Sequence, residues 1–240
     1  MLTMNDGIRI LLWTAASIGF LHTLMGPDHY LPFIVMARAR KWSVARTLWI
    51  TAACGLGHVA SSVVLGIVGI ALGIGVNSLV DIESARGNLA AWALTAFGLV
   101  YLIWGVRHAI RRKPHTHFHV HDHGTGHQHE HSHVEEHAHI HEGTEKKNIT
   151  PWVLFVIFIL GPCEPLIPIL MYPAAQNSIE GLVQVSVVFS VTTVATMLLI
   201  VLSSVWGLSM IPFGKMERYT HAIAGAMILL SGLAIQFLGL

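Results

Sequence analysis

The chain has 240 residues and a formal net charge of +1, and 53% of its residues are hydrophobic while only 11% are charged. Soluble globular domains carry about 25% charged residues, so this composition excludes an ordinary soluble domain. Several apolar runs exceed the roughly 20 residues that a helix needs to cross a bilayer, and no alternating strand pattern is present. We therefore expect an all-α, polytopic membrane protein that is surrounded by lipid and has no nucleic-acid partner.

Charges, Gly and Pro residues and apolar length together predict six transmembrane helices. They lie near residues 7–37, 44–76, 88–109, 151–174, 181–207 and 218–239. The first apolar run lacks a preceding basic segment and a following cleavage pattern, so we expect a retained helix. The second is long for one crossing, which predicts a tilt, a bend or a projection beyond the bilayer.

The first predicted helix contains the stretch "GFLHTLMGPDHYLPF", in which His22, Asp28 and His29 surround the pair Gly26-Pro27. Proline lacks an N–H donor and Gly allows a bend, so the pair frees backbone carbonyls that lipid cannot satisfy. Such a break is tolerated where it faces protein or a water-filled cavity. Asp, Lys or Arg at membrane depth costs about 2.5 to 3.5 kcal/mol, which makes intramembrane ionisable groups candidates for function. The alternative is that the proline only kinks the helix for packing.

Two further segments carry polar groups within apolar runs. His58 ends the stretch "GLGH" in the second helix, where a packing histidine is the alternative to a metal ligand. The fourth helix is broken at Gly161-Pro162, and Cys163 and Glu164 follow that pair directly. We predict a metal pathway formed by His22, Asp28, His29, His58, Cys163 and Glu164.

An internal repeat appears at an offset of 135 residues. "GPDHYLPFIVM" overlays "GPCEPLIPILM" with identical Gly, Pro, Leu, Ile and Met, and segments of the second and third helices match the fifth and sixth nearly in register. Three crossings in each repeat would make the two halves inverted, as in many secondary transporters, which bind substrate near the midplane. We predict a first repeat over 1–110, a loop over 111–148 and a second repeat over 149–240. Chance similarity among apolar segments is the alternative.

The positive charges are distributed unequally between the two sides of the six-helix plan. Twelve of the 14 Lys and Arg residues lie in the loops after the first, third and fifth helices, and Arg9 and Arg86 lie on the other side. The positive-inside rule then places the central loop in the cytoplasm and both termini outside.

The central loop is rich in histidine. Twelve of the 17 histidines lie in it. The predicted loop ligands are these twelve: His115, His117, His119, His121, His123, His127, His129, His131, His133, His137, His139 and His141. We expect the loop to be disordered without metal and to bind Ni, Co, Cu or Zn ions. A neutral spacer or a pH-sensitive charge cluster is the alternative.

These features resemble the NicO group of nickel and cobalt transporters, in particular its small bacterial members described as UreH-like or sulfite-exporter-like. The resemblance rests on "LHTLMGPDH", "GLGH", the His-rich loop and "GPCEPLIP". The group has four residues between its first His and the Asp-His pair, whereas this chain has five between His22 and Asp28. On a continuous helix the insertion rotates His22 by about 100°. The resemblance implies a multi-pass protein of a bacterial inner membrane.

Three function classes remain open at this point, and none is an enzyme with a fixed cofactor. The first is a transporter of nickel or cobalt with zinc as a further option. The cytoplasmic side of the His-rich loop favours an exporter, and import is the alternative because a cytosolic loop can equally accept imported ions. The second is a thiol-disulfide electron carrier of the cytochrome c biogenesis type, which requires paired cysteines, although the repeat partner of Cys163 is Asp28. The third is an anion or sulfur-compound exporter, which requires a midplane Lys or Arg, and we expect none there. A homo-oligomer is compatible with all three.

Overall fold

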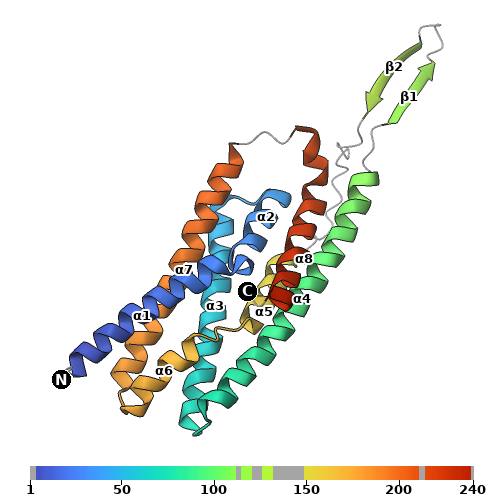
Figure 1. Ribbon diagram of the computed structural model, residues 1–240. Coiled ribbons are helices and arrows are strands. Elements are labelled where there is room, and N and C mark those ends of the chain that lie inside the picture. The colour runs from blue at the N-terminus through green and yellow to red at the C-terminus, as the bar shows by residue number, and fades with distance from the viewer. Residues whose placement is uncertain (1–3, 112–114, 121–125, 132–148, 211–213, 239–240) are drawn as a thin grey trace, which may run out of the picture.

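The computed structural model describes residues 4–111, 115–120, 126–131, 149–210 and 214–238. The elements in chain order are α1 (Met4–Met25), η1 (Pro27–His29), α2 (Leu31–Ala39), α3 (Val44–Ala71), α4 (Val76–Arg111), β1 (His115–Val120), β2 (Gly126–His131), α5 (Thr150–Leu160), α6 (Leu166–Ala175), α7 (Ile179–Ser209), η2 (Gly214–Tyr219) and α8 (Thr220–Leu238). Figure 1 shows the helices as one bundle, with the β1–β2 hairpin projecting beyond the end of α4.

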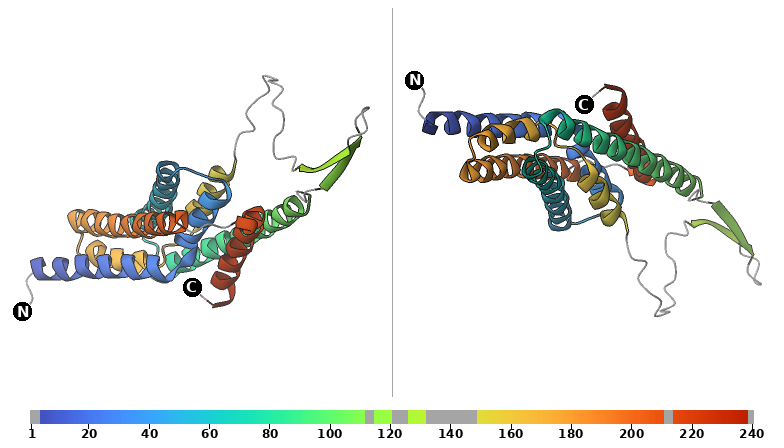
Figure 2. Two further views of the ribbon diagram at one scale, coloured as in Figure 1. Left: turned by 90° about the horizontal axis from the view of Figure 1, so that it is seen from above. Right: turned by 90° about the horizontal axis from the view of Figure 1, so that it is seen from below.

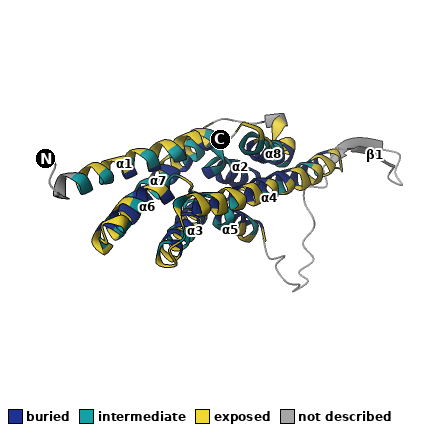
Figure 3. Ribbon diagram, turned by 60° about the horizontal axis from the view of Figure 1, so that its bottom comes forward, coloured by how far each residue is buried: buried dark blue, intermediate teal, exposed yellow. Residues whose placement is uncertain are grey.

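The described helices have the length and surface of a membrane protein. Five of them, α1, α3, α4, α7 and the segment containing α8, are long and apolar enough to cross a bilayer. Their outward faces are exposed (Figure 3) and carry large apolar side chains, among them Trp13, Trp49 and Phe237, each more than 70% exposed. Exposed apolar area of this extent is stable against lipid rather than water. The chain is therefore a polytopic helical membrane protein.

Both Gly-Pro pairs break a helix, as the sequence predicts. The first separates α1 from α2 with only the short helix η1 between them, and the second separates α5 from α6. Each broken helix is followed by two long helices, α3 and α4 in one half and α7 and α8 in the other. In Figure 1, α3 descends and α4 rises, whereas α7 rises and α8 descends. The two halves thus share one order of elements.

Helices of one half pack mainly on helices of the other. The most extensive contact among the described helices joins α4 to α8, α1 lies beside α7 (Figure 2), and α3 lies beside α5. The α4–α8 crossing is close because glycines remove side chains there: a Cβ on Gly98 would lie 2.3 Å from the Leu229 nitrogen, and a Cβ on Gly232 would lie 2.4 Å from Thr95 Oγ1. The broken helices are therefore enclosed by long helices of both halves.

Two elements differ from the expectation. Helix α4 begins at Val76 rather than near residue 88, which adds about three turns at its N-terminal end. Within the predicted loop, β1 and β2 pair antiparallel with each histidine of β1 opposite one of β2: His115 with His131, His117 with His129 and His119 with His127. Histidine alternates with other residues in both segments, and a period of two residues is that of a β-strand. The paired strands are a regular structure in a loop for which the sequence predicts disorder. The remaining loop histidines, His121, His123, His133, His137, His139 and His141, lie outside the described residues.

Candidate metal centre

The first break begins where α1 ends at Met25. Gly26 leaves the helical conformation with φ −90° and ψ 95°, and Pro27 begins η1 without an N–H to donate. The Gly26 N–H still donates to the His22 carbonyl at 3.0 Å, so His22 remains in the last turn of α1. The change of direction after Gly26 then brings His29 back toward His22.

Three imidazole rings meet at this break. His22 lies on α1, His29 on η1 and His58 on α3, and the last two are at most 4% exposed. The ring centroid of His29 lies 4.7 Å from that of His22 and 5.0 Å from that of His58. The centroids of His22 and His58 are 6.5 Å apart. One ligand nitrogen from each ring lies within 4.8 Å of the other two. The three histidines form the only such group of three or more possible ligands found among the described residues.

Hydrogen bonds orient two of the rings. His29 Nδ1 lies 3.2 Å from both the Gly26 carbonyl oxygen and Asp28 Oδ1, and His58 Nδ1 lies 3.2 Å from the Phe158 carbonyl oxygen. A carbonyl oxygen can only accept, so each Nδ1 carries a proton, and in the neutral imidazole each Nε2 then presents a lone pair. This is the arrangement in which histidines bind metals in proteins, with the second nitrogen held by a carbonyl or carboxylate.

The Nε2 atoms of the three rings have few hydrogen-bond partners. The Nε2 atoms of His22 and His29 are buried without a hydrogen-bond partner. His58 Nε2 has one, the Cys163 thiol, whose sulfur lies 3.3 Å away. An unpaired polar atom in a membrane interior is costly, and a metal ion would satisfy all three nitrogens. Tetrahedral coordination at about 2.0 to 2.1 Å separates ligand nitrogens by about 3.3 Å, so small ring rotations are enough to close the site.

A cavity of about 380 Å³ adjoins the three histidines. Asp28 and both break glycines line it together with apolar residues of α4 and α5. Its volume exceeds that of a hydrated metal ion, and the carboxylate at its wall favours a cation. The cluster and the cavity therefore fit a transition-metal cation with imidazole ligands.

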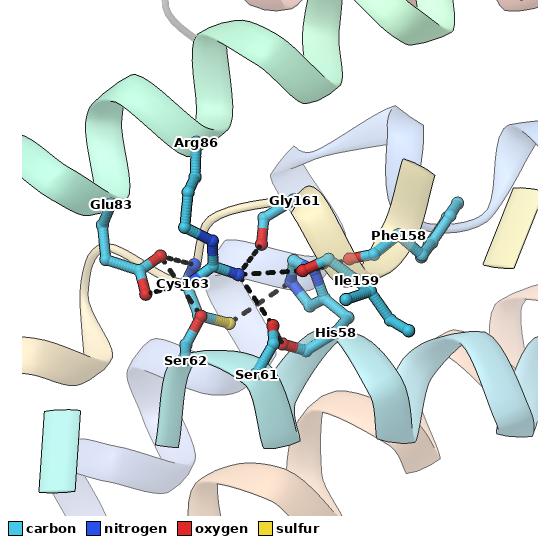
Figure 4. Close-up of polar contacts among 9 residues, drawn as sticks. All are labelled: His58, Ser61, Ser62, Glu83, Arg86, Phe158, Ile159, Gly161 and Cys163. Atoms are coloured by element: carbon cyan, nitrogen blue, oxygen red, sulfur yellow. Dashed lines mark hydrogen bonds and ion pairs between the residues drawn. The ribbon is translucent and has the colours of Figure 1, made fainter. Parts of the chain in front are cut away.

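The second break is built differently (Figure 4). Glu83 on α4 is fully buried, and its Oε2 accepts hydrogen bonds from the Cys163 N–H at 3.1 Å and the Ser62 hydroxyl at 3.2 Å. Arg86 Nη1 donates to Glu83 Oε1 at 2.6 Å. Arg86 Nη2 lies 2.9 Å from the Ile159 carbonyl oxygen, 3.2 Å from that of Gly161 and 2.7 Å from Ser61 Oγ. The carbonyls freed at the end of α5 are thus occupied by a cation of the chain itself.

Most of the predicted pathway residues meet at these two breaks. His22, Asp28, His29 and His58 line the cavity, and Cys163 contacts His58 from outside the cavity wall. His22 joins the cluster because the chain is not a continuous helix at Gly26, so the rotation implied by the extra residue does not apply. Glu164 is exposed and does not line the cavity, so it is not part of the cluster. Pro165 after it, together with the turn at Glu164, directs the chain into α6.

Two residues of the second break were absent from the predicted set. A third helix that starts near residue 88 leaves Arg86 outside the bilayer and Glu83 outside the predicted helices. The expectation of no Lys or Arg near the centre is therefore wrong, since Arg86 reaches the Gly161 carbonyl. Its charge is compensated by Glu83, which leaves no free cationic group for an anion there. The spacing of Leu79, Glu83 and Gly87 at helical period was the signal that α4 continues upstream.

Comparisons with known proteins give one result about the family. Residues 30–236 match the model of the cytochrome C biogenesis protein transmembrane region. Neither curated proteins nor solved structures include a significant match. The matched region contains His58, Glu83, Arg86 and Cys163, and it starts one residue after His29. Since it covers more than half of the chain, this protein belongs to the family of the cytochrome C biogenesis protein transmembrane region.

Proposed function

We propose that the protein transports a divalent transition-metal cation, nickel or cobalt with zinc as a further option, through the centre formed by His22, His29 and His58. The observation that carries this proposal is the pair of buried, unpartnered Nε2 atoms on His22 and His29, two residues that line a cavity within a membrane protein. Neutral imidazole binds Ni, Co and Zn well, whereas Mg and Ca prefer oxygen ligands. The resemblance of "LHTLMGPDH" to nickel and cobalt transporters supports the same substrate class.

We infer further that the two halves are inverted repeats of three crossings each, with the broken helices as the first and fourth. The matching order of elements and the opposite directions of α3 and α7 support this plan. So does the α4–α8 crossing: Gly98 contacts Leu229 and Gly232 contacts Thr95, and an offset of 134 residues exchanges these two pairs. Transporters of this construction bind substrate where broken helices of the two halves meet.

A transport cycle follows from this plan. Metal collected by the cytoplasmic His-rich loop passes to the three imidazoles, and rocking of one half against the other exposes it outside. Protons compete with metal for imidazole nitrogens, so an inward proton flux would release the ion and could drive export. The direction rests on the positive-inside rule, which puts the loop in the cytoplasm and the termini outside.

A second candidate, a thiol-disulfide electron carrier, is favoured by the family match, which supports it better than metal transport. Such a carrier needs two thiols that react with each other or with a partner. Cys54 and Cys163 are both buried free thiols, and they belong to different apolar clusters. Asp28 stands where the repeat would place a partner for Cys163. The geometry therefore favours metal transport over this candidate.

Reconstituted vesicles separate the two candidates. We expect a flux of Ni²⁺, Co²⁺ or Zn²⁺ that depends on the protein. His29→Ala should abolish this flux, whereas the double variant Cys54→Ser, Cys163→Ser should retain a measurable flux. Tyr30→Phe is the matched control, because the neighbouring hydroxyl contacts only the Leu24 carbonyl oxygen at 3.3 Å. A protein that moves no metal but loses transmembrane thiol reduction on Cys163→Ser would overturn metal transport and establish the electron carrier.

A further inference from the structure

The second break is held by side chains from the other half of the protein. Glu83 and Arg86 lie on α4 and Ser61 and Ser62 on α3, and we call these four residues the clamp. Their partners beyond the clamp are the Ile159 and Gly161 carbonyls and the Cys163 N–H. Every hydrogen bond between the clamp and these three backbone groups joins the first half to the second.

Both oxygens of the Glu83 carboxylate already have partners. Glu83 Oε1 receives Arg86, and its Oε2 receives Ser62 and Cys163. A buried carboxylate with these bonds is stable only while its cation is present, and removal of one partner leaves an uncompensated charge. A role as an adaptable ligand for an incoming ion does not fit a carboxylate that is buried and already bonded to a cation at Oε1 and to two donors at Oε2. A role in fixing the backbone of the break does.

The fixed backbone controls a thiol. Cys163 is fully buried, and its sulfur lies 3.3 Å from His58 Nε2, a possible metal ligand. Its position is set on one side by the Glu83 bond to its N–H and on the other by Pro162, which packs against Gly87 so closely that a Cβ there would lie 2.7 Å from the proline Cγ. Glu83, Arg86 and Gly87 lie within little more than one turn of α4.

We propose that Glu83 and Arg86 are positioning residues that close the second break and keep the Cys163 thiol buried against His58. Because the clamp joins the two halves, their relative movement has to break it, and Cys163 becomes accessible when it opens. The clamp would serve this purpose whether the thiol contacts a metal ion or a redox partner, so the inference does not depend on metal transport.

The test measures how fast N-ethylmaleimide labels Cys163 in purified, metal-free protein, in a Cys54→Ser background that leaves one thiol. We expect Arg86→Gln and Glu83→Gln each to accelerate labelling by at least about tenfold, since local opening limits reaction of a buried group. Arg86→Lys retains the ion pair but cannot span both carbonyls and Ser61, so it should accelerate labelling by about threefold.

A matched control separates positioning from general loss of stability. Ile228→Ala removes a fully buried side chain from the other apolar cluster, so it should destabilise the protein without exposing Cys163. Wild-type labelling rates in Arg86→Lys and in the folded Gln variants would overturn the proposal. Equal acceleration by Ile228→Ala would overturn it as well, because the thiol would then report overall unfolding. Metal flux is not measured, so failure here is distinct from failure of the transport proposal.

Discussion

The two breaks start from the same Gly-Pro pair and end in opposite polar surroundings. At the first, the Nε2 atoms of His22 and His29 are buried with no hydrogen-bond partner, and both residues line a cavity. At the second, the freed carbonyls of Ile159 and Gly161 are bonded by Arg86. One break is left open for a ligand and the other is closed by the chain itself.

The difference shows that a duplicated helix break does not imply a duplicated binding site. In both breaks the glycine lies against an imidazole: a Cβ on Gly26 would be 2.5 Å from His29 Nδ1, and a Cβ on Gly161 would be 2.9 Å from His58 Nδ1. What differs is the residue that follows proline and the helix that covers the break. Metal binding should therefore depend strongly on the three imidazoles, and local stability on the clamp at the second break.

Removal of an imidazole from the centre should cause the largest loss of metal affinity. His58→Ala removes one of three nitrogen ligands, and the loss of affinity for Ni²⁺ or Zn²⁺ should be at least about 100-fold, because even outer partners of such ligands are worth about 10 to 100-fold. Competition titration of purified protein measures it. Thr51→Ala is the control on the same helix, since that hydroxyl bonds only to its own helix at Thr47. Unchanged affinity in His58→Ala would remove the basis of the metal centre.

Much of the fold follows from apolar length and Gly-Pro pairs, but the start of α4 does not. Asn77, Ser78 and Asp81 lower the hydropathy of its first turns, so charge and hydropathy suggest a boundary near residue 88. The helix continues because its buried face persists at Leu79 and Glu83. A buried carboxylate is indistinguishable from a surface one until the helix that carries it is known to reach the core.

The site shows the same limit at shorter range. The cluster of His29, Asp28 and His58 follows from ionisable groups in apolar helices, whereas the position of His22 depends on the backbone angles at Gly26. Glu164 occupies the repeat position of His29 but is exposed. The first break continues as a short helix through His29, whereas the second turns at Glu164 and Pro165, and a sequence overlay does not carry that difference.

An added methyl group at either break glycine tests the feature that the two breaks share, the contact between the glycine and an imidazole. Gly26→Ala would displace the His29 ring, and Gly161→Ala would displace the His58 ring. Each variant keeps all three histidines but shifts one of them, so each should weaken metal affinity by about 10-fold. The same titration measures both. Gly207→Ala has nothing within 4 Å of its added Cβ and should leave affinity unchanged. A full retention of affinity in both break variants would show that the rings are free to rearrange.

Loss of one hydroxyl from the clamp should affect stability rather than binding. Ser62→Ala removes a donor to the buried Glu83 carboxylate and should lower the free energy of unfolding by about 1 kcal/mol. Denaturant unfolding in detergent measures this, with Ser190→Ala as the control because its hydroxyl bonds within its own helix to Ser186. Metal affinity should change by less than about twofold, since no ligand nitrogen is touched. A large loss of affinity with unchanged stability would reverse the roles assigned to the two breaks.

Deletion of residues 115–141 should have the smallest effect on the centre itself. The deletion removes twelve histidines, including the paired ones of β1 and β2, but none of His22, His29 or His58. The number of metal ions bound should fall, while the affinity of the remaining site should change by less than about twofold, because sites without shared partners act independently. Calorimetric titration gives both quantities. If the affinity of the remaining site falls by the same factor as in His58→Ala, the loop supplies a ligand to the centre, and the three imidazoles alone do not hold the ion.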